Sequence, residues 1–370
     1  MCRMVVGLIV AVWTLACSMA QAAAPALEEM AGAMLMIGFR GTVLSPDVLD
    51  ALQCGAVGGV ILFDKDTQIK GPRNIESPEQ LRQLTATLHA HAKHPLLIAV
   101  DQEGGRVARL PAAKGFAALP SAETMGAQDT RQTYRYARNT GEELNRLGIN
   151  VNLAPVVDLR RADPSPGLGD MGRLFGAAPR QVSAHAKAFA QGLLASGIIP
   201  ALKHFPGLGS SNLDSHNALP DVTDSWSDDE LAPYREAIAA HWPGMILVGH
   251  VLNRQLDPAL PASLSPHVIE GLLRGQLQFE GVVISDDLGM GAVSETYSLE
   301  ERVRLAVLAG NDILLFGNNG KDYDPKLAAK VHATLINLVR QGKITPARLQ
   351  VSWERLTRLK AQLTRQDSAR

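Results

Sequence analysis

Short apolar runs alternate with longer amphipathic segments along the chain from residue 34 onward. Each run is almost continuously apolar, which is how strands read when both faces of their sheet are buried. The runs lie at Met34–Phe39, Val57–Phe63, Leu96–Asp101, Ile149–Val157, Ile198–His204, Met245–Val251, Gly281–Asp286 and Asp312–Phe316. We predict that these eight runs are strands of one parallel sheet.

The segments between the runs carry helix signals. Ser77-Pro78-Glu79-Gln80 combines an N-cap residue with proline at the first helical position and glutamine three residues after the cap. Leu81, Leu84 and Leu88 then follow at helical spacing. Similar segments predict helices over 129–147, 180–196, 228–240 and 300–308, and a basic amphipathic helix over 346–363 whose charges form a solvated face.

Eight strand–helix units predict a (β/α)8 barrel of the TIM type. The alternative is an open doubly wound sheet, which a glycine-rich phosphate loop after the first strand would favour. The sequence there is Gly38-Phe39-Arg40-Gly41, which does not match that loop. We therefore predict one catalytic barrel domain with a C-terminal helix over residues 23–370, without a second domain.

The first residues read as a secretory signal peptide. Arg3 precedes the apolar run Met4–Ala16, and small residues follow at 20–24. A basic start, an apolar middle and an Ala-x-Ala site predict cleavage after Ala22, so residues 1–22 are the signal peptide. The mature chain is then expected in the periplasm or the medium, without a membrane span.

Two alternatives for this segment are less favoured. An uncleaved membrane anchor would have to include Ser18 and Gln21, which make a poor span. A lipoprotein would use Cys17, but Thr14 stands where such sites usually have leucine. After cleavage Cys54 is the one remaining cysteine, so no intrachain disulfide is expected.

The composition is that of a soluble globular protein. The chain has 370 residues, of which 46% are hydrophobic, and a formal net charge of −1. This is enough for a sizeable core. A charge near zero without a basic run argues against a nucleic-acid partner.

Polar residues gather where the predicted strands end. The third run ends at Asp101, the fifth at Lys203-His204, the sixth near His250 and the seventh at Asp286-Asp287. A carboxylate that closes an apolar strand is costly unless it is paired or used. In a (β/α)8 barrel the active site lies at these strand ends. By strand alternation, one of Asp286 and Asp287 points into the barrel mouth and the other packs or pairs outside it.

Three segments at these strand ends resemble glycoside hydrolase family 3, and its single-domain β-N-acetylhexosaminidase branch most closely, over roughly residues 29–363. They are Asp101-Gln102-Glu103-Gly104-Gly105-Arg106-Val107-Ala108-Arg109, then Lys203-His204-Phe205-Pro206-Gly207-Leu208-Gly209 with Asp214-Ser215-His216, and Gly281–Met290. Two departures are that Leu208 stands where the family usually has histidine, and that the segment before Arg173-Leu174-Phe175 is rearranged.

The resemblance implies a retaining, exo-acting enzyme that hydrolyses terminal β-linked N-acetylamino sugars without a cofactor or metal. By this resemblance Asp286 rather than Asp287 is the nucleophile, and Asp214 with His216 is the acid/base pair. The two-residue spacing of that pair lets the carboxylate orient the imidazole, which titrates near neutral pH. The resemblance further implies that the terminal sugar is bound by Asp101, Arg109, Arg173, Lys203 and His204. For His250, a histidine satisfied within the fold is as good an interpretation as a ligand contact.

Other functions remain to be weighed against this one. A family 3 β-glucosidase or β-xylosidase usually takes its acid/base from a second domain, whereas this chain carries the Asp-x-His loop. A metal-dependent hydrolase could use His204, Asp214, His216 and Asp286, but the tight His-x-His spacing is missing. A periplasmic sugar-binding protein would need neither Asp286 nor His216. The natural substrate stays open between cell-wall fragments and chitin-type oligosaccharides, because related cytosolic enzymes recycle cell-wall units whereas export is expected here.

Overall fold

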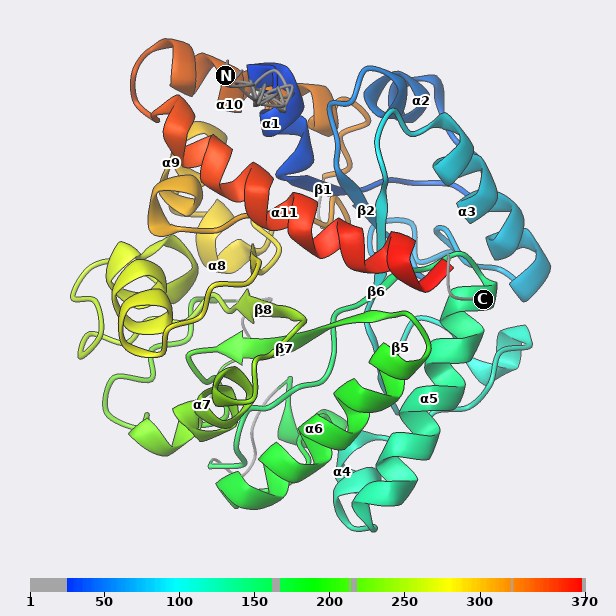
Figure 1. The fold of residues 1–370 in the computed structure, drawn as a ribbon, viewed down its shortest axis with the longest axis vertical. Helices are drawn as coiled ribbons and strands as arrows, with labels where there is room; N and C mark the ends of the chain where they lie inside the picture. The colour runs from blue at the N-terminus through cyan, green and yellow to red at the C-terminus, as the bar shows by residue number, and fades with distance from the viewer. Residues whose placement is uncertain (1–24, 162–166, 212, 214–217, 321, 368–370) are drawn as a thin grey trace, which may run out of the picture.

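Each of the eight predicted runs overlaps a strand of one parallel sheet that curls into a barrel surrounded by helices (Figure 1). The computed structural model describes residues 25–161, 167–211, 213, 218–320 and 322–367. Around the barrel the strands follow the order β10-β1-β2-β3-β6-β7-β8-β9. A parallel bridge between Ile284 and Ile313 joins β9 to β10, and the Ser285 N–H donates to the Ile313 carbonyl at 3.0 Å. The (β/α)8 barrel is thus confirmed over the open sheet.

The strands are short, and every residue in the eight barrel strands is buried. This explains their continuously apolar sequence, since the barrel interior covers one face and the helices cover the other. The barrel strands are β1 (Leu35–Gly38), β2 (Gly59–Ile61), β3 (Leu97–Val100), β6 (Val151–Asn152), β7 (Ile199–Phe205), β8 (Met245–Val248), β9 (Val283–Ser285) and β10 (Leu314–Phe316). A small antiparallel hairpin, β4 (Gln102–Gly104) and β5 (Val107–Ala108), follows β3.

The predicted helices are present, and the N-cap that the sequence indicated at Ser77 is formed. The Ser77 hydroxyl accepts from the Gln80 N–H at 3.2 Å, and Asp129 accepts from the Arg131 N–H at 2.8 Å. The segment predicted as one helix over 228–240 divides into the 3-10 turn η3 (Asp228–Leu231) and α7 (Ala232–Ala239). The other α-helices are α1 (Leu27–Ala33), α2 (Pro46–Gln53), α3 (Pro78–His91), α4 (Ala122–Gly126), α5 (Thr130–Arg146), α6 (Pro179–Ala195), α8 (Gly291–Ser294), α9 (Leu299–Ala309), α10 (Leu327–Arg340) and α11 (Pro346–Asp367).

Short irregular helices complete the chain between these elements. They are the 3-10 turns η1 (Ala112–Lys114), η2 (Gly169–Met171) and η4 (Ala262–Leu264), and the π-helical segment η5 (His267–Gln276). No helix in the described part of the chain is long and apolar enough to cross a membrane.

The C-terminal helix α11 crosses the barrel at the amino ends of its strands, opposite the ends where polar residues gather (Figure 1). Its charges were expected on a solvated face, and that expectation is wrong for three of them. Arg355 donates to the buried Asp312 at 3.2 Å, and Arg348 donates to the Asn311 carbonyl at 2.8 Å. Lys360 donates to the Gly58 carbonyl at 3.2 Å, and its burial lowers its pKa to about 8. The Asp312 carboxylate, just before β10, attracts Arg348 and Arg355 toward the barrel. The helical pattern alone does not reveal this long-range contact.

Candidate active site

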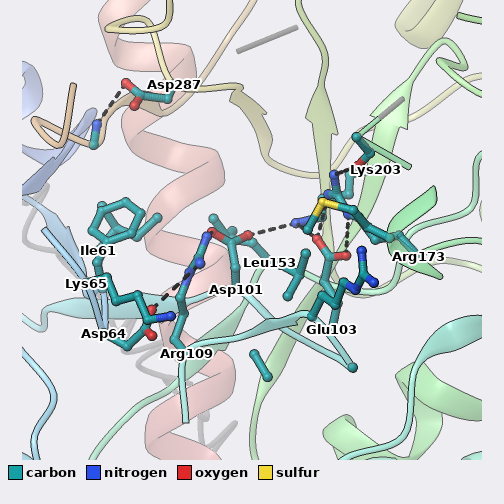
Figure 2. Close-up of a pocket in the computed structure, with 18 of the residues that line it drawn as sticks. Ile61, Asp64, Lys65, Asp101, Glu103, Arg109, Leu153, Arg173, Lys203 and Asp287 are labelled. Carbon is teal, nitrogen blue, oxygen red and sulfur yellow. Dashed lines mark hydrogen bonds and ion pairs between the residues drawn. The ribbon is translucent and has the colours of Figure 1, made fainter. Parts of the chain in front are cut away.

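A cavity of about 850 Å³ opens where the barrel strands end and their loops begin (Figure 2). Residues after β2, β3 and β9, residues at the end of β7 and the β4–β5 hairpin all contribute to its wall. Apolar side chains such as Leu153, Leu247 and Leu315 form its floor at the carboxyl ends of the strands. This is the edge at which a barrel of this kind carries its active site.

The cavity wall contains the residues expected there, as far as they are described. They are the expected sugar-binding residues Asp101, Arg109, Arg173, Lys203 and His204 together with the expected nucleophile Asp286. Asp214 and His216, the expected acid/base pair, lie outside the described residues. The structure therefore brings six of the predicted site residues into one cavity.

Four charged side chains form a tight network in this wall. Lys203 Nζ lies 2.7 Å from Asp101 Oδ1 and 2.6 Å from Glu103 Oε1. Arg173 donates to Glu103 through two nitrogens, Nε and Nη2, each at 2.7 Å. Such paired N–H···O bonds hold both planar groups in one orientation. The lysine and arginine heads are therefore fixed before any ligand arrives.

Mutual attraction keeps these four groups charged. Burial alone would raise the pKa of Asp101 and of Glu103, but Lys203 with Arg109 or Arg173 outweighs it, so both pKa values are lowered. Burial would lower the pKa of Lys203 and of Arg173, but the two carboxylates outweigh it and raise both. These shifts keep all four groups charged near neutral pH, which suits them to binding polar groups rather than to acid–base transfer.

His204 is oriented by a carboxylate from the neighbouring strand end. Its Nδ1 lies 2.7 Å from Oδ2 of Asp158, which is 1% exposed. The second oxygen of Asp158 accepts from the Leu208 N–H at 2.8 Å, so the same carboxylate also anchors the segment that follows β7. The Lys203–His204 and Phe205–Pro206 peptides in this segment are cis. His204 Nε2 faces Arg173 Nη2 at 3.5 Å, so the ring is held against the cation network.

Asp286 and Asp287 follow β9 and both line the cavity. The second residue, Asp287, pairs as expected, with backbone N–H groups, but it does so within the cavity wall rather than outside the mouth, because β9 ends at Ser285 and strand alternation does not extend past it. Asp287 accepts from the N–H groups of Gly289 and Gly317, each at 2.8 Å, and its burial raises its pKa. Asp287 thus ties the end of β9 to the loop after β10.

Asp286 is held by the backbone of its surroundings. Its N–H donates to the Val248 carbonyl at 2.9 Å, and its Oδ1 accepts from the Asp287 N–H at 2.9 Å. The first bond fixes its backbone to β8, and the second orients its carboxylate. The Asp286 carboxylate is therefore oriented at the cavity wall by the next residue of the chain, on a backbone anchored to β8.

His250 belongs to the fold rather than to the cavity. It is fully buried, its Nδ1 lies 2.7 Å from the Ser263 hydroxyl, and its Nε2 lies 2.9 Å from the Asp287 carbonyl. Both ring nitrogens are therefore satisfied, which decides between the two interpretations left open by the sequence. Its contact with the Asp287 carbonyl helps to hold the backbone of that cavity residue in position.

Two acidic residues of the cavity wall were missed by sequence reasoning. Glu103 lies two residues after Asp101, in strand β4 of the hairpin that follows β3, and it also lines the cavity. Asp64 follows β2 and approaches Arg109 to 3.8 Å. The signal that could have found both is a carboxylate just after a buried strand, the same signal that selected Asp101.

The metal-dependent alternative finds no support in side-chain placement within the described ranges. No three His, Cys, Asp or Glu side chains converge there as a metal ion would require. Two of the four residues that could have served, Asp214 and His216, lie outside those ranges.

Comparison with known proteins adds an independent observation. Residues 26–359 match the family model described as the N-terminal domain of glycosyl hydrolase family 3. A protein of Alkalilimnicola ehrlichii named Beta-hexosaminidase is 40% identical over 295 residues, which cover 77% of this chain and 80% of that protein. A Beta-hexosaminidase of Xylella fastidiosa is 39% identical over 292 residues, covering 76% of this chain and 82% of that protein.

Solved structures agree with these relatives. The β-N-acetylhexosaminidase of Beutenbergia cavernae superposes with a TM-score of 0.80 at 30% identity, covering 91% of this chain and 99% of that one. A family 3 β-N-acetylglucosaminidase from a Paenibacillus species gives a TM-score of 0.84 at 36% identity over 92% of this chain. This chain spans 63% of the Paenibacillus protein.

Proposed function

The chain belongs to glycosyl hydrolase family 3, and we propose that it is a retaining, exo-acting β-N-acetylhexosaminidase. The observation that carries this proposal is the position of Asp286, which lies in one cavity with a preorganised set of charged groups suited to sugar hydroxyls. The names of the relatives that match at about 40% identity support the N-acetylamino sugar as substrate.

Asp286 attacks the anomeric carbon of the terminal sugar and forms a covalent glycosyl-enzyme intermediate. Retaining glycosidases place a carboxylate below the sugar for this step, and water then releases the sugar. The N–H of Asp287, which donates to Asp286 Oδ1, supports the role by holding the carboxylate in one orientation. The bond from leaving oxygen to anomeric carbon breaks as the bond to Asp286 forms.

His216, oriented by Asp214, supplies the proton for the leaving oxygen and later accepts one from the attacking water. The assignment is supported by the resemblance of the Asp214-Ser215-His216 segment to the family. Asp101, Glu103, Arg173 and Lys203 hold their charges through the neutral range, so none of them performs the transfer. An imidazole with an ordinary pKa near 6.5 can do so.

The substrate is a cell-wall fragment or a chitin-type oligosaccharide met outside the cytoplasm. This part of the proposal rests on the basic–apolar–small pattern of residues 3–24. The mature protein should begin near Ala23 in the periplasm or the medium. Recovery of a chain that begins at Met1 from the soluble cytosol would contradict export.

A panel of nitrophenyl glycosides tests the activity directly. The purified protein should hydrolyse nitrophenyl β-N-acetylglucosaminide well and nitrophenyl β-glucoside poorly, and Asp286→Asn should abolish both reactions. Preference for the glucoside would favour the β-glucosidase alternative. Binding of N-acetylglucosamine without hydrolysis of any glycoside would favour a sugar-binding protein.

A further inference from the structure

Asp64 is an acidic residue of the cavity wall whose hydrogen-bonding capacity is largely unused. Its side chain is 9% exposed, and among the described residues its carboxylate meets one cation, Arg109 Nη1, at 3.8 Å. This separation is longer than a hydrogen bond. A carboxylate that is nine-tenths buried at this distance from its partner retains its capacity to accept further bonds.

Arg109 is similarly underused. Its Nη2 lies 3.6 Å from Asp101 Oδ2, and its Nε is buried without a hydrogen-bond partner in the described structure. Figure 2 shows Arg109 lying between Asp64 and Asp101 on one side of the cavity. Its guanidinium therefore faces two carboxylates and makes a close bond to neither.

These residues complete a row of alternating charges along the cavity wall. The row runs from Asp64 through Arg109, Asp101, Lys203 and Glu103 to Arg173. At the Glu103 end the ion pairs measure 2.6–2.7 Å, whereas at the Asp64 end they measure 3.6–3.8 Å. The loose end is the part of the row that has room for hydroxyl groups between its charges.

The backbone at Asp64 is fixed in this place. Its carbonyl accepts from Lys114 Nζ at 3.1 Å and from the Arg73 N–H at 3.4 Å. The preceding residue, Phe63, donates its N–H to the Asn74 side chain at 3.0 Å, and its ring lies under the Arg109 guanidinium with 5.4 Å to its centroid. Asp64 and Arg109 are thus held near each other independently of any ligand.

We propose that Asp64 binds substrate directly, accepting a hydrogen bond from a hydroxyl of the terminal sugar while Arg109 donates to the same hydroxyl. A hydroxyl is both a donor and an acceptor, so it fits between a carboxylate and a guanidinium. Asp101, on the other side of Arg109, then receives a neighbouring hydroxyl of the same ring. The inference rests on the proposed function, because it takes the ligand of the cavity to be a sugar.

A substrate–variant cycle tests the assignment. The value of kcat/KM is measured for wild type and Asp64→Ala on nitrophenyl β-N-acetylglucosaminide and on its 3-, 4- and 6-deoxy analogues. For one analogue, the wild type should lose about 10- to 100-fold, as expected when a hydrogen bond to a charged group is lost. Asp64→Ala should show that loss on the complete substrate and almost no further loss on that analogue.

Two other variants make the cycle decisive. Asp64→Asn keeps the shape of the side chain and replaces Asp64→Ala in the cycle if the alanine variant does not fold. Asp170→Asn changes an exposed carboxylate next to Met171 that is outside the cavity wall, and it should retain wild-type values on every substrate.

Each remaining outcome would overturn the assignment. If Asp64→Ala lowers kcat/KM by one common factor and keeps the wild-type penalty for every deoxy analogue, Asp64 merely positions Arg109. Unchanged kinetics in Asp64→Ala would exclude any contact. If the wild type hydrolyses no N-acetylamino glycoside, the proposed function is contradicted, and with it the ligand named here. If the wild type is active but Asp64→Ala keeps the wild-type penalty for every deoxy analogue, only the present inference is contradicted.

Discussion

The Nζ of Lys203 lies 2.6 Å from Oε1 of Glu103, and both side chains are 3% exposed. The two residues are brought together from β7 and from the hairpin after β3, so this ion pair links two sides of the cavity. Glu103 also receives both N–H bonds of Arg173. One carboxylate therefore compensates two buried cations that the substrate is expected to meet.

Glu103→Gln should be strongly destabilising for that reason. Removing one partner of a buried ion pair leaves uncompensated charge and costs about 3–5 kcal/mol. Lys203 and Arg173 would also shift, so kcat/KM should fall at least ~10-fold. Denaturant unfolding and steady-state kinetics measure the two effects. Glu79→Gln, which removes an exposed pair with Arg82, should leave the unfolding midpoint unchanged. A Glu103→Gln protein as stable as wild type would refute the role given to this pair.

Glu230 is a buried residue that packs against Gly207 in the segment after β7. It is 1% exposed, and its Oε2 accepts from the Leu159 N–H at 3.2 Å. Gly207 packs on it so closely that a Cβ at that glycine, whose φ is 121°, would lie 2.5 Å from Glu230 Cβ. Burial, with the nearby Asp158 carboxylate, raises the pKa of Glu230 to about 8.

This raised pKa predicts a pH dependence of stability. The folded protein holds the Glu230 proton more tightly than the unfolded chain does. The stabilisation of the fold by this proton is therefore fully present below pH 4.5 and is lost as the pH rises toward 8. The loss is at most about 1.4 kcal/mol per pH unit across that window. Glu230→Gln should therefore gain stability relative to wild type between pH 5 and pH 9, measured as the difference in Tm. Glu236→Gln, an exposed change on α7, should run parallel to wild type. Parallel curves for Glu230→Gln would contradict the burial of an ionisable proton at this site.

The barrel and much of its site could be predicted from sequence because the relevant signals are local. The runs at Met34–Phe39 and Asp312–Phe316 are apolar since their strands are covered on both faces, and Ser77 caps the helix that it precedes. Asp101, Lys203 and Asp286 stand directly at strand ends, where the fold itself places them around one mouth.

What could not be predicted depends on which distant side chains meet. Glu103 and Arg173 are separated by 70 positions, and no local pattern pairs them. Asp312 draws Arg355 inward from a helix whose periodicity predicted a solvated face. At Asp286 and Asp287 the alternation rule failed because the strand ends one residue earlier, so the loop decides where the two carboxylates point.

The proton-transfer role of His216 predicts a dependence on the leaving group. His216→Ala should lose roughly 10²- to 10⁴-fold in rate on substrates with poor leaving groups. The loss should be far smaller on nitrophenyl glycosides, because their nitrophenolate leaving group departs without a proton. Asp214→Ala should show the same pattern more weakly, since it orients the imidazole. The alkaline limb of the pH–rate profile should shift or vanish in His216→Ala. Equal losses on good and poor leaving groups would make His216 a binding or structural residue.

The central claim is that Asp286 carries the covalent intermediate, and labelling with a 5-fluoro glycosyl inactivator of N-acetylglucosamine tests it most directly. Asp286→Ala should lower kcat at least ~10³-fold without changing the unfolding midpoint, since it removes the nucleophile from a pre-formed wall. Asp287→Ala is the matched variant of the neighbouring residue. It should lower the unfolding midpoint in addition to any loss of activity, because Asp287 accepts from the Gly289 and Gly317 N–H groups. Mass spectrometry of the digested, inactivated enzyme should find the sugar on the peptide that holds Asp286, attached to that residue. A label on any other residue, or inactivation without a covalent adduct, would contradict the account.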